Sequence, residues 1–171
     1  PSWGMVRYMS SAIAIRADSV KAFIENPVFL SSLSSWFFAQ LLKAVIVLLR
    51  RGSKRSAREL IETIAWRTGG MPSSHAALVS SMSASVAIRE GIGSNLFVVA
   101  LFMSFIVMRD AMGVRRSSGL QARYLNWLGR QLAEKQEIEY HPIKEIHGHT
   151  PLEVVVGMFL GIFIAAAYAY L

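Results

Sequence analysis

Cysteine is absent from the 171 residues, and charged side chains are scarce at 17%. Without thiols the chain can form neither a disulfide nor a thiolate nucleophile. Soluble domains carry about a quarter charged residues, so this shortage of charge argues against an ordinary soluble domain. The composition is 53% hydrophobic with a mean hydropathy of +0.40. Acidic residues number 11 against 18 basic ones, a net charge of +7. This balance fits a membrane protein whose apolar segments are flanked by basic residues.

The amino-terminal residues divide into two parts. Residues 1–4 precede an apparent start methionine, Met5, and we expect them to be foreign to the native chain. No cleavable signal peptide is evident. Apolar positions over 8–25 recur at helical spacing with charges between them, which predicts an amphipathic helix on the membrane surface. We therefore expect an extension over 1–25 and a membrane-embedded domain over 26–171.

Four segments are long and apolar enough to cross a bilayer, which takes about 20 residues. They are residues 28–49, 72–88, 95–112 and 152–171. The second is the weakest and is rich in Ala and Ser, which suits close helix packing, although a buried soluble helix is the alternative. The sequence predicts an all-α integral membrane helical bundle of about four transmembrane helices plus the amphipathic helix.

The basic residues predict the orientation. Residues 50–67 hold six Arg and Lys, residues 109–149 hold seven, and the turn between the second and third spans holds only Arg89. The positive-inside rule places both basic segments in the cytoplasm, although the amino-terminal helix carries three cations on the other side. A soluble nucleic-acid binder would also be basic, but these cations flank apolar spans. We expect a protein of the bacterial inner membrane that binds membrane lipids and no nucleic acid.

The stretch "GGMPSSH" predicts a helix start that binds an anion. Pro72 suits the first turn, and the N–H groups around Ser73 and Ser74 are free at a helix terminus. Gly70 lets the backbone approach a ligand closely. His75 would then lie beside the anion. In the alternative interpretation, the prolyl and seryl residues only cap the helix and His75 is a packed side chain.

A second histidine opens the last span, in "HGHTPLEV". Thr150 and Glu153 form a T-x-x-E capping box with Pro151 at the first helical position. His149 and Glu153 are four residues apart, close enough for the carboxylate to orient the imidazole as a base or nucleophile. Both roles for Glu153 stay open.

A metal cluster is a further alternative, because His141, His147 and His149 lie near Glu145 in the sequence. Their spacing matches no strong metal-binding motif, so we expect neither a metal nor a cofactor.

The segment "MRDAMGVRRSSGLQARYLN", residues 108–126, supplies guanidinium groups suited to phosphate, from Arg115 and Arg109. Asp110 is costly in lipid, so we expect it to pair with one of them. Gln121 and Asn126 are candidate members of the same polar network. The remaining arginines are expected to hold anionic headgroups at the interface: Arg116, Arg123 and Arg130.

Five stretches of the chain carry a resemblance to a known family: "GGMPSSHAALV", "RDAMGVRRSSGLQARYLN", "GHTPLEVVVG" and the shorter "NPVF" and "AQLLK". Together they resemble the divergent, small membrane branch of the type 2 phosphatidic acid phosphatase and vanadium haloperoxidase superfamily. The resemblance covers about residues 26–171. It implies a helical bundle that hydrolyses phosphate monoesters or pyrophosphates without metal, through a phosphohistidine.

The resemblance also implies roles for residues. Pro72, Ser73, Ser74 and His75 match the family's P-S-G-H motif, with Ser74 in place of glycine, and His75 would protonate the leaving group. His149 would be the nucleophile and Glu153, where the family has aspartate, its orienting group. Lys43 matches the lysine with which the family holds phosphate. From the residues themselves we expect the backbone donors of Ser73 and Ser74 to bind phosphate too, with Arg115, Arg109 or Lys144 in place of the family's missing arginine.

The leading hypothesis is therefore a metal-independent phosphatase of a lipid phosphate or pyrophosphate, with its site toward the cytoplasm. The family's arginine six residues before the nucleophile corresponds to Ile143. Its first motif, a Lys followed seven residues later by Arg-Pro, would start at Lys43, but Arg50 and Arg51 stand at the Arg-Pro positions and the proline is absent. These departures keep open a protein that binds or transports a phospholipid or polyprenyl phosphate without cleaving it, and, more remotely, haloperoxidase chemistry with vanadate. The glycines of "GMFLGIF", residues 157–163, would permit a homodimer.

Overall fold

The computed structural model describes residues 17–51, 70–136, 139–145 and 148–170. Within these ranges every regular element is an α-helix, and no strand occurs. The helices are α2 (Ala17–Ile24), α3 (Pro27–Arg51), α5 (Ser74–Glu90), α6 (Asn95–Met112), α7 (Val114–Gln136) and α8 (Pro151–Ala169). Of the predicted amphipathic helix, only α2 lies within the described residues. The basic segment 50–67 lies almost wholly outside them.

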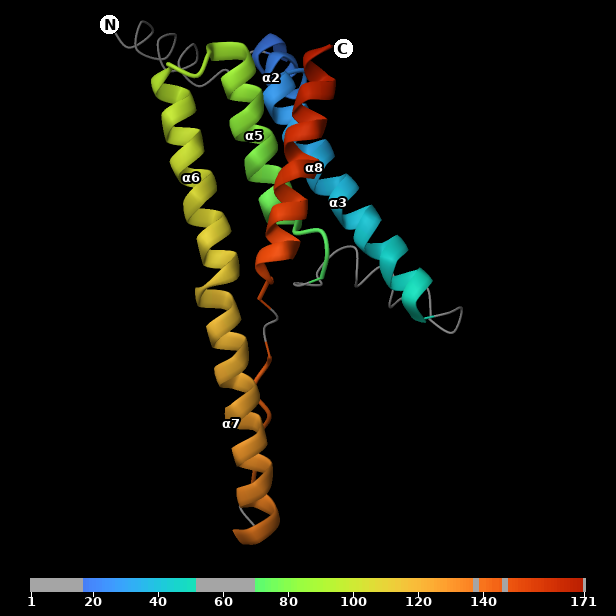
Figure 1. Cartoon of the computed structure of the whole chain (residues 1–171), viewed down its shortest axis with the longest axis vertical. Coiled ribbons are helices and arrows are strands. Elements are labelled where there is room, and N and C mark those ends of the chain that lie inside the picture. The colour runs from blue at the N-terminus through green and yellow to red at the C-terminus, as the bar shows by residue number, and fades with distance from the viewer. Residues whose placement is uncertain (1–16, 52–69, 137–138, 146–147, 171) are drawn as a thin grey trace, which may run out of the picture.

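The bundle is built around α5, which packs against α3, α6 and α8 (Figure 1). In the part of the chain that the structure describes, three helical stretches are long and apolar enough to cross a membrane: Pro27–Leu49, the apolar part of Asn95–Lys135, and Pro151–Ala169. The α5 helix has 17 residues, nine of them buried. At 1.5 Å per residue it is about 25 Å long, so it lies within the same layer although its composition is less apolar. The chain is an all-helical membrane bundle, as predicted.

Two glycines of α8 bring it onto α5. A Cβ atom at Gly157 would collide with the carbonyl oxygen of Ser73, and one at Gly161 with the carbonyl oxygen of Ala77. Only glycine therefore allows the two backbones to approach this closely. The G-x-x-x-G pattern, which suggested a homodimer in the sequence, is used inside the chain. It gives no support to a dimer.

Serine hydroxyls join the helices across the bundle. The Ser31 and Ser85 hydroxyls lie 2.6 Å apart between α3 and α5, and Ser35 donates to the Ala77 carbonyl at 3.0 Å. Ser104 of α6 donates to the Val79 carbonyl of α5 at 2.8 Å. A hydroxyl that finds an acceptor can be buried in a bundle at little cost, and its small volume permits close packing. This explains why the serine-rich α5 lies in the centre rather than facing lipid.

The large apolar side chains face outward instead. Exposed ones on the three most apolar helices include Phe37, Phe38, Phe102, Phe105, Phe159 and Phe163. An outer surface of this kind suits hydrocarbon, whereas a water-soluble domain rarely exposes a large contiguous apolar area.

The third predicted span continues into a helix that the sequence analysis did not anticipate. The α7 helix follows α6 almost in line and projects well past the ends of α5 and α8 (Figure 1). Residues 139–145 run back beside α7, and residues 148–150 lead into the start of α8. This returning segment delivers His149 to the bundle.

The close approach of α5 and α8 predicts a strong effect of one added methyl group. Gly161→Ala should lower the thermal unfolding temperature in detergent, because overpacking costs about 1–3 kcal/mol. Gly93→Ala is the matched control, since a Cβ there meets nothing within 4 Å. Equal unfolding temperatures for the two variants would contradict this packing.

Candidate functional site

The amino ends of α5 and α8 meet at one end of the bundle. The Ser73 N–H donates to the Glu153 carbonyl at 2.9 Å, and the Ser73 hydroxyl accepts from the Ala76 N–H at 3.3 Å, as an N-cap does. Two helix termini, each with positive partial charge, therefore lie side by side. A helix does begin at "MPSSH", as predicted, but its N-cap is Ser73, so Pro72 precedes the cap and does not lie in the first turn.

The donors at this terminus differ from the prediction in one respect. We expected the Ser73 N–H to be free for phosphate, but the Glu153 carbonyl occupies it. The Ser74 and His75 amides lie in the first turn of α5, and no acceptor for them occurs among the described residues. These two amides are the available donors. Pro72 and Ser74 are buried, and Gly70 has the positive φ of 89° that favours glycine.

His149 is held from two sides. Its backbone N–H donates to the Ala111 carbonyl, at the end of α6, over 3.0 Å. Its ring Nδ1 lies 3.1 Å from Glu153 Oε2. The residue is 4% exposed. A carboxylate only accepts, so Nδ1 carries the proton in this hydrogen bond and Nε2 keeps the lone pair. The imidazole thus has the tautomer that a nucleophile or base needs.

Glu153 serves the helix cap and the histidine together. Its Oε2 accepts from the Thr150 N–H at 3.0 Å, and the Thr150 hydroxyl accepts from the Glu153 N–H at 3.4 Å, which completes a capping box. The same Oε2 faces His149. The two roles left open by the sequence therefore coexist.

The second histidine and the cations converge on this place. His75 lies within electrostatic range of His149, Arg115, Lys43 and Asp110. Its side chain is exposed, unlike that of His149, so it is accessible to a ligand. The packed, inaccessible His75 of the alternative interpretation is wrong.

Lys43 is buried at 3% exposure, and its aliphatic stem packs on Gly70. A side chain on Gly70 would meet the lysine Cγ and Cδ at 3.7 Å. Lys43 comes from α3, and the cluster also includes His75 of α5, Asp110 of α6, Arg115 of α7 and Glu153 of α8.

Arg115 and Asp110 form the ion pair expected from the sequence, with Nε and Oδ2 2.7 Å apart. Arg109, unlike Arg115, is not among the charges that act on His75 and His149. Its exposed side chain lines a depression on the outer side of the junction between α6 and α7. The structure thus groups Arg115 with the histidines and separates Arg109 from the predicted phosphate-binding set.

Asn126 has a different role from the one expected. Its buried amide donates to the Ile143 carbonyl at 2.8 Å and to Glu145 Oε1 at 2.9 Å, and its oxygen accepts from the Ile143 N–H and the Tyr140 hydroxyl. It therefore fastens the returning segment to α7 and acts on His149 only through that segment. Gln121 is exposed on α7.

Two positioning features were missed in the sequence. A Cβ at Gly148 would collide with the backbone of Arg116, so glycine lets the returning chain cross α7 closely before His149. The Ala111 carbonyl then receives the His149 N–H. The glycine between two histidines was a signal for the first feature. A backbone carbonyl leaves no signal in the sequence.

The pKa of His149 is lowered from its ordinary value, chiefly because the side chain is buried. The hydrogen bond and charge of Glu153 oppose this and raise the pKa, and the charges of Lys43 and Arg115 lower it further. The imidazole is consequently neutral at pH 7, as a nucleophile must be.

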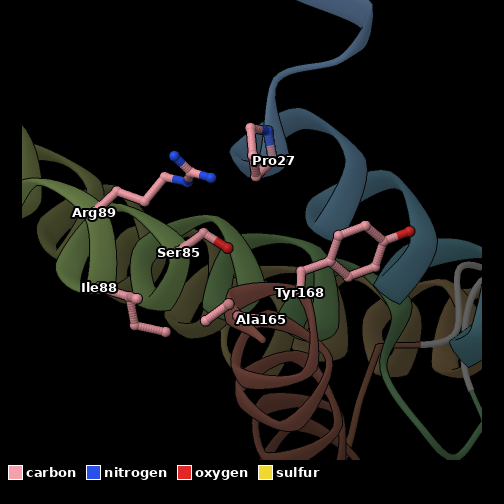
Figure 2. Close-up of a pocket in the computed structure, with 7 residues that line it drawn as sticks. Pro27, Ser85, Ile88, Arg89, Ala165 and Tyr168 are labelled. Carbon is pink, nitrogen blue, oxygen red and sulfur yellow. The ribbon is translucent and has the colours of Figure 1, made fainter. Parts of the chain in front are cut away.

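Other cavities and clusters lie away from this site. A cavity of about 80 Å³ at the opposite end of α5 is lined by Ser85, Arg89, Tyr168 and neighbours (Figure 2). Its Ser85 and Tyr168 hydroxyls lie within hydrogen-bond distance of α3 serines. As for metals, no group of three or more His, Asp or Glu side chains is placed to hold a metal ion within the described ranges, and His147 lies outside them.

The fold and the histidine pair define a helical membrane protein with a polar site where its helix ends meet. Comparison with known proteins identifies the family. Residues 24–164 match the Divergent PAP2 family, and the chain belongs to it. It is 36% identical over 158 residues to the "Uncharacterized membrane protein YuiD" of Bacillus subtilis (strain 168), covering 86% of this chain and 96% of that one. No solved structure matches.

The His149–Glu153 pair predicts a measurable pKa change. Glu153→Gln keeps an acceptor for the Thr150 N–H but removes the charge, so the pKa of His149 should fall further below 6.5. Histidine ¹⁵N NMR titration in micelles measures this, with Glu139→Gln, an exposed site, as the control. An unchanged or raised pKa of His149 would show that the carboxylate does not act on it.

The Asn126 contacts predict a local effect on the returning segment. Asn126→Ala removes two part-buried hydrogen bonds to the Ile143 backbone, each worth about 0.5–1.5 kcal/mol. Hydrogen exchange of residues 139–149 should accelerate, whereas Gln121→Ala should leave it unchanged. Equal exchange in both variants would contradict the anchoring role.

Proposed function

We propose that this protein is a metal-independent phosphatase that hydrolyses a lipid phosphate or lipid pyrophosphate through a phosphohistidine at the membrane interface. The observation that carries the proposal is a buried histidine, oriented by a carboxylate and within electrostatic range of a second histidine and two cations. Membership of the Divergent PAP2 family supports the same chemistry.

In the first step, the Nε2 lone pair of His149 forms a bond to phosphorus while the bond from phosphorus to the lipid oxygen breaks. The electron pair goes to that oxygen, which takes a proton from His75. The negative charge of a bound phosphate favours the protonated form of His75. Glu153 stabilises the positive charge that develops on the His149 ring.

In the second step, water attacks the phosphohistidine and gives a proton to His75, which is now neutral. The N–P bond breaks, its electron pair returns to Nε2, and inorganic phosphate leaves. His75 thus acts first as acid and then as base. The enzyme returns to its starting protonation state.

Electrostatic stabilisation would supply most of the rate enhancement, because phosphoryl transfer needs little other than positioning and neutralised charge. Lys43 and Arg115 face the equatorial oxygens in this proposal, and the Ser74 and His75 amides add backbone donors. Asp110 fixes Arg115 through their ion pair. The site opens toward the cytoplasm, as the basic segments imply.

The test is phosphate release by the purified full chain in detergent, with and without a chelator. Phosphatidic acid, phosphatidylglycerol phosphate and a polyprenyl pyrophosphate are the substrates. We expect chelator-resistant release that falls at least about a hundredfold in His149→Ala and His75→Ala. The rate should also fall as the pH drops through the lowered pKa of His149, because protonation removes the lone pair.

His141→Ala is the matched control, because this exposed histidine lies outside the cluster and its substitution should leave the rate unchanged. Binding of these lipids without turnover, undiminished in His149→Ala, would overturn the proposal. The exposed Ile143, at the position where the family has arginine, would then favour binding or transport of the lipid.

A further inference from the structure

The depression beside Arg109 lies where α6 meets α7. It has a volume of about 680 Å³ and is lined by Ile106, Arg109, Asp110, Met112, Gly113 and Val114. Its walls are mainly apolar, with one cation and one carboxylate. Ile106 and Val114 are 62% and 66% exposed, so the depression opens outward from the bundle.

The depression and the candidate active site share one residue, Asp110. Asp110 lines the depression, and its carboxylate also accepts from Arg115 Nε at 2.7 Å. Arg115 in turn acts electrostatically on both His75 and His149. Asp110 therefore links the two places, and a molecule with its phosphate beside Arg115 and its tail past Asp110 would lie along the depression.

The position also indicates which part of a molecule belongs there. Residues Asn95–Met112 form an apolar, membrane-spanning helix, and the depression lies over its last turns. Ile106, Met112 and Val114 offer hydrocarbon contacts, whereas Arg109 at the rim suits the polar, anionic end of a lipid. Arg109 therefore has a place in substrate binding, although it lies outside the phosphate cluster.

We propose that this depression holds the first part of the hydrocarbon tail of the lipid phosphate whose headgroup lies at His149, with Arg109 pairing with the headgroup at the rim. The proposal rests on the proposed function for the identity of the headgroup site. It assigns the substrate to long-chain lipid phosphates and makes the α6–α7 junction the side from which they enter.

Photo-crosslinking tests occupancy without turnover. Benzoylphenylalanine replaces Ile106, or Val99 as the control, which is 60% exposed on the same helix two turns away. The full-length protein is placed in phosphatidylcholine nanodiscs with a non-hydrolysable phosphonate analogue of phosphatidic acid, radiolabelled in its acyl chain. We expect crosslinking at 106 that unlabelled phosphonate reduces several-fold and added phosphatidylcholine does not. Equal, uncompeted crosslinking at both positions means bulk lipid only and overturns the proposal.

Kinetic measurements test the tail site separately from the phosphatase assignment. Ile106→Trp should fill the depression and lower kcat/KM for long-chain phosphatidic acid roughly tenfold, the scale of a few lost apolar contacts. Its kcat/KM for p-nitrophenyl phosphate, which has no tail, should stay unchanged, and Val99→Trp should change neither.

If Ile106→Trp hydrolyses both substrates at the wild-type rate, the tail site is wrong although the phosphatase assignment stands. If crosslinking at 106 is competed by the phosphonate but the wild type hydrolyses nothing, the tail site stands and the phosphatase assignment fails.

Discussion

A single backbone hydrogen bond, from the Ser73 N–H to the Glu153 carbonyl, holds the amino ends of α5 and α8 together, and the candidate site depends on it. The approach is possible because Gly157 and Gly161 present no side chain to α5. Each helix end orients its own histidine, so once the two ends meet, His75 and His149 lie at one place. The same contact concentrates two helix dipoles there, which favours an anion before any cationic side chain is counted.

The carboxylates near that contact are committed to partners within the protein, and this arrangement suits the binding of a phosphate. Lys43 is buried, and its charge and that of Arg115 both act on His75 and His149. Arg115 is partly neutralised by Asp110, and Glu153 is committed to the cap and to His149. Binding of an anionic headgroup would therefore relieve repulsion as well as form contacts. Glu153 both positions His149 and contributes negative charge to the site, so the position of the histidine and the electrostatics of the site are coupled.

Much of the fold and part of the site could be predicted from the sequence. Apolar runs predict the spans, and the T-x-x-E pattern predicts the Thr150 cap, because both signals are local. The α7 helix was missed because its mixed polarity resembles a loop, and the role of Asn126 was missed because its partners are 14 to 19 residues away. Arg109 and Arg115 were grouped as phosphate ligands on residue type alone. Only the three-dimensional arrangement shows that Arg115 pairs with Asp110 near the histidines whereas Arg109 lines the depression.

The account depends most on covalent participation of His149, which trapping of a phosphorylated enzyme tests directly. The full chain would be mixed with lipid phosphate labelled with ³²P in the transferred group, quenched in alkali, and mapped by mass spectrometry. The account predicts label on His149 that is stable to alkali and labile to acid, and none in His149→Ala. Steady turnover by a protein that never carries the label on His149 would contradict it.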